Sequence, residues 1–239
     1  MGGHLIYDLS RAVRDRFTSE PGMEVFPVWS PDGRSIVYSS AQGGSVPYLV
    51  RRPLSGSQPE DLAPRGAFQI ARSFAPDGQT VYYSSAKAGT SWNLFRLSTK
   101  TKIAESLFST PFNEDEPEIS PDGKWIAFRS TATGTSEIYL QNLSGGESDR
   151  MRVSSKGGRD PRWRRDGQEL FYIAGERRTV MSATPRVPGQ WNDPILTELF
   201  RVPADIVGLE VLPDGQSFLT SDGTPGAADS LFHVIVGLK

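Results

Sequence analysis

Five aspartates recur along the 239-residue sequence, each followed by glycine and four of them preceded by proline. Evenly spaced carboxylates could ligate a metal ion or act as acids. In a tight turn, however, Pro presets φ, Asp accepts backbone N–H groups ahead of it, and Gly tolerates a positive φ. Aspartates in separate turns would also lie apart from one another. We therefore interpret the five as turn residues: Asp32, Asp77, Asp122, Asp166 and Asp214.

The sequence gives little support for nucleophilic catalysis or for a metal site. The glycine-preceded stretches at Ser45, Ser136 and Ser217 lack the Gly-x-Ser-x-Gly pattern of a nucleophile elbow. The chain has two histidines, His4 and His233, and no cysteine, so it can form neither a disulfide nor a zinc–thiolate site. No histidine pair or aspartate-rich loop has metal-ligand spacing. We expect no catalytic residue, no metal, no cofactor and no enzymatic activity.

Two charged stretches could bind a partner. The acidic run 113–118 falls between predicted strands and suits a solvated loop, a contact for a basic partner or a calcium site. Residues 149–178 hold eight Arg and one Lys against five acids. Within them, Arg162 and Arg164 flank Trp163, which could stack on bases. On a strand the two arginines would share one face and Trp163 the other. We therefore expect this stretch to form a solvated basic face or to bind a carboxylate-rich partner, and we expect it not to bind nucleic acid.

The elements that position these residues repeat with the aspartates, whose successive spacings are 45, 45, 44 and 48 residues. Large apolar residues stand three positions before the aspartates: Trp29, Phe74, Ile119, Trp163 and Val211. Others stand four positions after them: Ile36, Val81, Ile126, Leu170 and Phe218. Six positions after them come Tyr38, Tyr83, Phe128, Tyr172 and, breaking the pattern, Thr220. Short strands repeating at this period predict an all-β fold, a β-propeller of four-stranded blades.

The two chain ends are out of phase with the repeat. Residues 4–10 match the third strands of later units, residues 14–18 match a fourth strand, and the last unit supplies only three strands. We count 21 candidate strands, against 20 for five blades. We predict one propeller domain, 1–239, in which residues 1–19 close the ring of five blades. The alternative is a truncated six-bladed propeller. Closure predicts a monomer, whereas an open gap would allow a homodimer.

Bulk properties exclude some partners. A net charge of −2 gives no general attraction to nucleic acid or to an anionic membrane. No apolar run approaches the roughly 20 residues that span a bilayer. The N-terminal residues lack the basic and apolar regions of a signal peptide. We expect a soluble chain without a membrane span, and the sequence leaves its cellular compartment open.

The Ser-Pro-Asp-Gly repeats, followed by a strand ending in Ser-Ser, resemble the TolB-type β-propeller repeat. More specifically, residues 6–11, 26–33, 110–114 and 161–172 resemble the C-terminal propeller of bacterial eukaryotic-type Ser/Thr protein kinases. The resemblance covers essentially the whole chain and implies a sensor domain that binds proteins, usually with six or more blades. The kinase motifs themselves are missing, so the resemblance implies no phosphoryl transfer.

The loops that enter the inner strands are the predicted functional surface, because they differ between units while the scaffold repeats. They span residues 22–27, 66–72, 113–118, 157–162 and 204–210. Their polar members expected at the channel mouth are Glu24, Arg72, Asp115, Glu116, Arg159 and Asp160. Our first hypothesis is a non-enzymatic propeller that binds protein or peptide. The second is an accessory propeller that gates substrate access to a larger enzyme, and the third is a stand-alone hydrolase or lyase.

Overall fold

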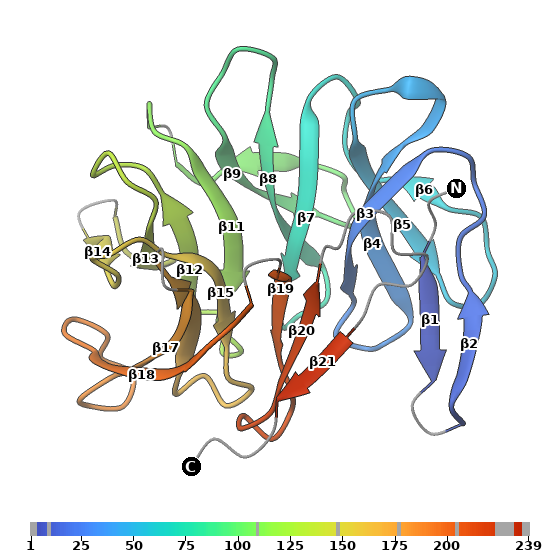
Figure 1. The fold of residues 1–239 in the computed structure, drawn as a ribbon. Helices are drawn as coiled ribbons and strands as arrows, with labels where there is room; N and C mark the ends of the chain where they lie inside the picture. Colours follow the sequence, from blue (N-terminus) through green and yellow to red (C-terminus); the bar gives the residue numbers. More distant parts are fainter. Residues whose placement is uncertain are drawn as a thin grey trace. The chain divides into compact units, whose positions relative to one another are not determined.

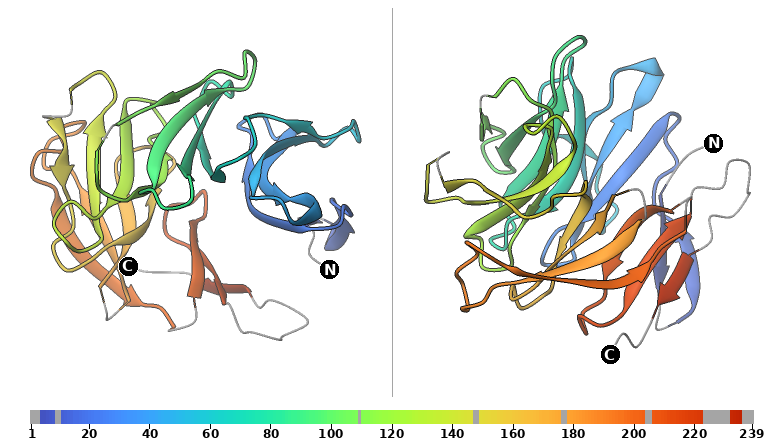
Figure 2. Two further views of the ribbon diagram at one scale, coloured as in Figure 1. Left: turned by 90° about the horizontal axis from the view of Figure 1, so that it is seen from above. Right: turned by 60° about the vertical axis from the view of Figure 1, so that its left-hand side comes forward.

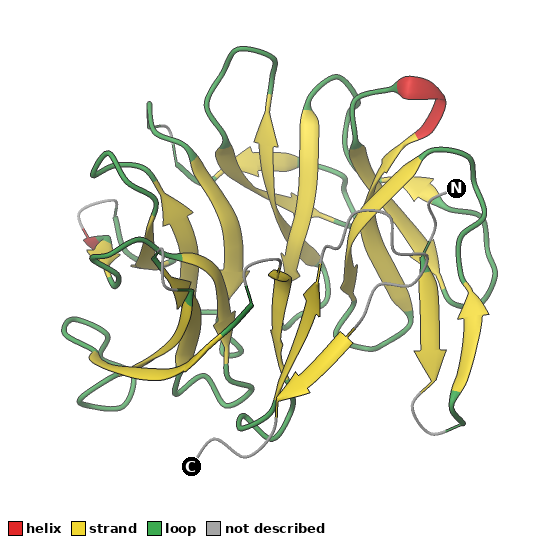
Figure 3. Cartoon of the chain, in the orientation of Figure 1, coloured by secondary structure: helices red, strands yellow, loops and turns green. Residues whose placement is uncertain are grey.

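The computed structural model describes residues 4–8, 11–108, 110–146, 149–175, 178–203, 206–222 and 232–235. The chain divides into two compact units, Met1–Asp115 (unit 1) and Glu116–Lys239 (unit 2). The described residues form 21 strands and the 3-10 turn η1 (Gln42–Gly44), as Figure 3 shows. No helix among them is long and apolar enough to cross a bilayer. The predicted all-β class and strand number are confirmed.

Unit 1 contains a hairpin and two four-stranded antiparallel sheets (Figure 1). The hairpin consists of β1 (Leu5–Asp8) and β2 (Val13–Arg16). The first sheet runs from inner to outer strand through β3 (Met23–Trp29), β4 (Ser35–Ala41), β5 (Tyr48–Pro53) and β6 (Glu60–Asp61). The second runs through β7 (Phe68–Phe74), β8 (Thr80–Ala86), β9 (Asn93–Ser98) and β10 (Ala104–Ser106).

The remaining strands form two four-stranded sheets and one three-stranded sheet. The first comprises β11 (Glu114–Ile119), β12 (Trp125–Ser130), β13 (Glu137–Asn142) and β14 (Met151–Arg152). The second comprises β15 (Arg159–Trp163), β16 (Leu170–Ala174), β17 (Thr179–Thr184) and β18 (Ile195–Arg201). The third comprises β19 (Ile206–Val211), β20 (Phe218–Asp222) and β21 (Phe232–Ile235). In the described residues β1 and β2 pair only with each other, so closure of the ring by the chain ends and the single domain stay predictions.

Neighbouring sheets pack face to face through the repeating apolar positions. In unit 1, Val37 and Leu49 of one sheet share a core cluster with Val81 and Tyr83 of the next. In unit 2 the sheets β11–β14 and β15–β18 lie against each other in the same way (Figure 2). The residues four and six positions after the turn aspartates are all at most 3% exposed. Burying one such large apolar side chain stabilises the fold by about 1.5–3 kcal/mol.

The apolar position before the turns is less uniform than predicted. Phe74, Ile119 and Trp163 are buried, but Trp29 is 49% exposed. In the described part of unit 1, only the β1–β2 hairpin lies against the face of the β3–β6 sheet that carries Trp29. Ile6 of this hairpin and Phe17, directly after it, pack against a cluster formed by residues of β4 and β5.

The five turn aspartates have the structural role predicted for them. In each, Oδ1 accepts a hydrogen bond from the backbone N–H two residues further on, at 2.8–3.0 Å. The glycine that follows each aspartate has a φ between 65° and 72°, a region that side chains other than glycine rarely occupy. The recurring motif therefore builds the turn between inner and second strands.

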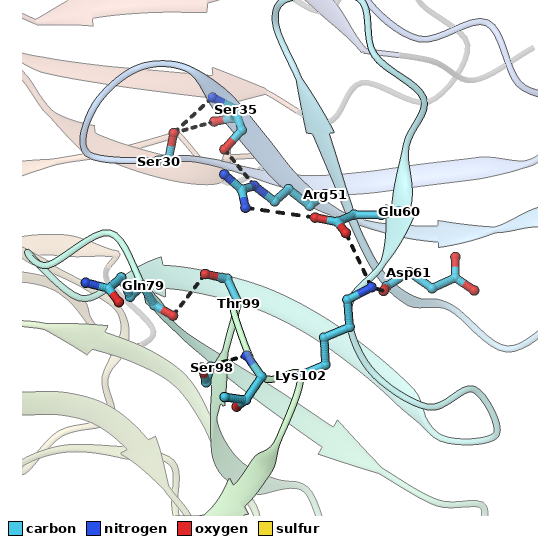
Figure 4. A network of polar contacts seen from close by, with 10 residues as sticks. Ser30, Ser35, Arg51, Glu60, Asp61, Gln79, Ser98, Thr99 and Lys102 are labelled. Carbon is cyan, nitrogen blue, oxygen red and sulfur yellow. Dashed lines mark hydrogen bonds and ion pairs between the residues drawn. The ribbon is translucent and has the colours of Figure 1, made fainter.

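Polar contacts join the outer strands of the two sheets in unit 1, as Figure 4 shows. Lys102, in the turn between β9 and β10, donates from Nζ to the backbone oxygen of Asp61 at 3.0 Å. The same Nζ lies 3.3 Å from Glu60 Oε2, and Arg51 lies 3.9 Å from Glu60 Oε1. Because Lys102 and Glu60 are both nearly half exposed, these contacts orient the strand ends and add little stability.

Replacing Phe128 by alanine tests the packing of the buried second-strand side chains. Phe128 is fully buried and its ring lies 5.9 Å from that of Tyr139. We expect Phe128→Ala to lower the free energy of unfolding by about 3–5 kcal/mol, because removing a fully buried ring leaves a cavity beside Tyr139. The measurement is urea unfolding followed by circular dichroism. Phe112→Ala is the control, since Phe112 is 39% exposed and its loss should cost about 1 kcal/mol or less. Equal losses would contradict this packing.

Candidate functional site

The inner strands are irregular near their entrance ends, five to seven residues before the turn aspartate. The register of pairing with the second strand shifts there in β3, β7, β15 and β19. Phe26, Glu116 and Asp160 have φ values of 55°, 55° and 52°, and each precedes a proline. A positive φ strains a residue that has a Cβ, and it persists only where the surroundings impose it. Such bulges redirect side chains and often lie beside functional sites.

In unit 2 the bulges bring charged groups of two sheets together. Glu116, on β11, accepts the backbone N–H of Asp160, on β15, at 2.7 Å. The other oxygen of Glu116 lies 3.5 Å from Nη1 of Arg129, on β12. The carboxylate of Asp160 pairs with Arg159. Glu116 and Asp160 are only 7% and 6% exposed, so this network connects the inner strands of neighbouring sheets in a largely dehydrated setting.

Arg162 extends the network to a third sheet. Its guanidinium lies 3.9 Å from Glu118 on β11 and 3.2 Å from Glu210 on β19, and its side chain is 15% exposed. Burial by itself would lower the pKa of Arg162, but the carboxylates of Glu210 and Glu118 raise that pKa above its ordinary value. Trp163, on the opposite face, donates from Nε1 to the backbone oxygen of Glu118 at 3.1 Å. The expected alternation is confirmed, but the solvated basic face is wrong for Arg162.

The acidic run 113–118 is also not a solvated loop. From Glu114 onwards it forms β11, in which Glu114 is fully buried. Pairing of the backbone with β12, and the cations and N–H groups of neighbouring strands, offset the cost of burying these carboxylates. More generally, most of the predicted entrance loops are the first residues of inner strands, since β3, β7, β11, β15 and β19 begin within them. Residues 204 and 205 lie outside the described part.

The structure places the six predicted site residues in different settings. It brings Glu116, Arg159 and Asp160 together, with Asp115 half-buried beside Glu116 on β11. Arg72, on β7 in unit 1, lies with its guanidinium 5.0 Å from the ring centre of Phe26.

Glu24, on β3, contacts the N-terminal segment. It is 7% exposed and accepts a hydrogen bond from the hydroxyl of Thr18. The Thr18 hydroxyl oxygen in turn accepts the backbone N–H of His4 at 2.7 Å, and the His4 ring stands edge-on to Tyr38 at 5.0 Å. Burial raises the pKa of Glu24, against the opposing effect of the Thr18 hydrogen bond, and burial lowers the pKa of His4. Both shifts favour the neutral side chains.

Sequence reasoning missed the partners Arg129, Glu118 and Glu210. One signal for Arg129 was available: it stands seven positions after Asp122, where the two preceding units carry Ser39 and Ser84. An arginine at a repeat position otherwise held by serine, near an acidic strand, indicates an ion pair. This arrangement of carboxylates and guanidinium groups can recognise the charged groups of a partner. Within the described ranges, no group of three His, Cys, Asp or Glu side chains could hold a metal ion.

The fold and the inner-strand geometry together define a β-propeller domain. Residues 54–198 match the profile of the TolB beta propeller domain, which is more than half of the chain. The chain therefore belongs to the TolB β-propeller family, which confirms the predicted resemblance and fold. The finer resemblance to kinase-attached propellers stays a prediction.

Solved structures support the same fold. TolB from Acinetobacter baumannii aligns with a TM-score of 0.78 and 19% identity, over 97% of this chain and 56% of that chain. A TolB-type protein from Agrobacterium tumefaciens aligns with a TM-score of 0.60 and 15% identity, over 97% and 96%. An oligogalacturonate lyase in complex with manganese aligns with a TM-score of 0.67 and 16% identity, over 98% and 68%. The chain thus spans little more than half of the Acinetobacter TolB. A search of curated proteins found no match.

Replacing Glu24 by glutamine tests its burial through the pH dependence of stability. Because burial raises the folded-state pKa of Glu24 above its ordinary value of 4.5, the folded state binds the proton more tightly than the unfolded state. The ionised carboxylate therefore costs stability at neutral pH, and this cost disappears as the pH falls through the raised pKa toward 4.5. We expect the stability difference between Glu24→Gln and the unsubstituted chain to be most favourable to the variant at pH 7 and to shrink toward pH 4.5.

Urea unfolding at pH 7, 6, 5 and 4.5 measures this difference. Glu105→Gln serves as the control, because Glu105 lies on the outer strand β10 with a half-exposed side chain. Its effect should be small at every pH. A Glu24→Gln difference that does not change with pH would contradict the burial of this carboxylate.

Proposed function

We propose that this TolB-family propeller is a non-enzymatic scaffold that binds a protein or peptide at the entrance ends of its inner strands. One observation carries the proposal: three of these strands hold a side chain in a strained backbone conformation at the same repeat position. The same position carries different residues in different sheets, Phe26, Glu116 and Asp160. A repeated backbone with variable side chains suits recognition, because the scaffold fixes the direction of groups that set specificity.

At β11 and β15 this end would offer a partner a mixed charge surface. The Arg159 side chain is 30% exposed beside the carboxylate of Asp160, and Asp115 is half-buried on the neighbouring inner strand. Interfaces of this kind gain specificity and association rate from charge complementarity more than they gain affinity. The proposed partner is therefore a protein or peptide segment that carries both an acid and a base.

The alternative of an accessory propeller in a larger enzyme has support from fold similarity alone. Prolyl endopeptidase structures align with 98% of this chain over 38% of their own length, at a TM-score of 0.61 and 11% identity. A stand-alone lyase has weaker support: the aligned oligogalacturonate lyase is in complex with manganese, whereas the described residues assemble no group of three His, Cys, Asp or Glu side chains that could hold a metal ion. Incubating the purified chain with oligogalacturonate and following the absorbance of unsaturated products distinguishes the lyase. We expect no increase.

The binding proposal is tested by charge reversal after a partner has been identified by co-purification from the native host. Isothermal titration calorimetry then compares Arg159→Glu and Asp115→Lys with the unsubstituted chain. Each reversal should weaken binding about tenfold or more, equivalent to about 1.4 kcal/mol, because it opposes a complementary charge. Lys124→Glu is the control, since Lys124 lies beyond the opposite end of β11 and its side chain is 71% exposed. Unchanged affinity in both test variants would contradict the proposed surface.

A further inference from the structure

The outer strand β18 differs from the other outer strands. It has seven residues, whereas β6, β10 and β14 have two, three and two. Short outer strands limit unwanted pairing at a sheet edge, and a long exposed one is a template for another strand. In the described structure β18 is the last strand of its sheet. Two of its apolar side chains are exposed, Ile195 at 44% and Leu196 at 42%.

Two cavities lie beside β18, and both are lined by Leu196. The larger, about 590 Å³, is also lined by Tyr172, Met181 and Glu198. The smaller, about 300 Å³, is also lined by Met151 of β14 and by Trp191. The smaller cavity is bordered by residues of the two outer strands β14 and β18. Because β14 has only two residues, it leaves part of the facing sheet uncovered.

The pairing of β17 with β18 shows which side chains face these cavities. Leu196 is paired with Ala183, and Glu198 is paired with Met181. Ala183 and Met181 belong to the core cluster that packs toward the β11–β14 sheet, and paired residues share a face. Ile195, one residue away, lies on the opposite face. A strand added to the β18 edge would place every second side chain on the Leu196 face, at the mouths of the two cavities.

Four charged residues border the cavities. Asp193 pairs with Arg186 at 2.9 Å. Arg152 is paired with Tyr139, whereas Met151 is paired with Leu140 of the core cluster, so the Arg152 side chain lies on the other face of β14. Lys156 and Glu198 line the larger cavity, and Lys156 is the cation there that a carboxylate close to the apolar anchor of a ligand would complement.

We propose that the β18 edge of unit 2 binds an extended peptide segment of another protein by strand addition. One apolar side chain of the peptide occupies the larger cavity beside Leu196, and an acidic residue next to it lies near Lys156. Main-chain hydrogen bonds to β18 supply affinity, and the two cavities select alternate side chains. This surface is separate from the entrance ends of the inner strands and does not depend on their role.

A second copy of the chain fits this edge less well. Full antiparallel overlap of two β18 strands, Ile195–Arg201, would place their central residues, both Glu198, directly opposite each other. Like charges opposite each other destabilise a strand pair. A peptide with neutral or basic residues at that place has no such cost.

Selection from a library of random seven-residue peptides displayed on phage tests the proposal, with counter-selection against Leu196→Asp. Enriched peptides should contain an apolar residue with an acid one or two positions away. The absence of enrichment, or enrichment of peptides without such a pair, would overturn the proposal. Circular dichroism checks that each variant is folded. Because Leu196 is exposed, we expect its substitution to leave the fold intact.

Fluorescence anisotropy then measures how the affinity for the most enriched peptide depends on the two faces of β18 and on the backbone of the peptide. Leu196→Asp should weaken binding about tenfold or more, whereas Ile195→Asp, on the other face, should change it less than about threefold. Two versions of the peptide, N-methylated at odd or at even positions, separate strand addition from side-chain binding. One version should lose binding and the other keep it.

Equal effects of the two aspartate variants, or equal binding of both methylated peptides, would overturn the proposal. Arg159→Glu should leave the affinity unchanged, which keeps this test independent of the inner-strand surface. Analytical ultracentrifugation tests whether a second copy of the chain binds to β18 instead. This would be shown, and the proposal overturned, if the unsubstituted chain were a dimer and the Leu196→Asp variant a monomer.

Discussion

Burial of both faces of each sheet is the constraint on which this structure depends. In β4, Ile36, Val37 and Tyr38 are 2%, 0% and 0% exposed, although successive strand residues point to opposite faces. A four-stranded sheet with apolar residues on both faces cannot bury them alone, so each sheet needs a neighbour on either side. The turn motif then serves one purpose, which is to hold the inner and second strands in register so that these residues meet the next sheet.

The same constraint shapes the polar chemistry of unit 2. Inner strands that pack between neighbours also bury carboxylates and guanidinium groups, and such groups are tolerated only when paired. Glu116 therefore receives a backbone N–H and an arginine, and Arg162 lies between two carboxylates. Because these pairs join neighbouring sheets, the entrance end of the inner strands is rigid as well as charged. Rigid placement of polar groups is what recognition of a partner requires.

Local patterns were sufficient to predict the repeat, since an Asp-Gly turn and alternating apolar residues act over a few residues. The burial of Tyr83 and Phe128 followed from that alternation. The acidic strand β11 could not be predicted in this way, because the groups that stabilise Glu116 come from Arg129 and from Asp160, which lies 44 residues further on. The bulges were missed for a related reason. A positive φ at a residue before proline is imposed by neighbouring strands, and local sequence disfavours it.

Amide hydrogen exchange of the whole chain, followed by mass spectrometry, tests the central constraint most directly. Second strands are paired along both edges and covered on both faces, whereas the hairpin strand β2 is exposed along its whole length. The account predicts that peptides from β4, β8, β12 and β16 exchange slowest, and that peptides from β2 exchange fast. Exchange of the second strands as fast as that of β2 would contradict the account.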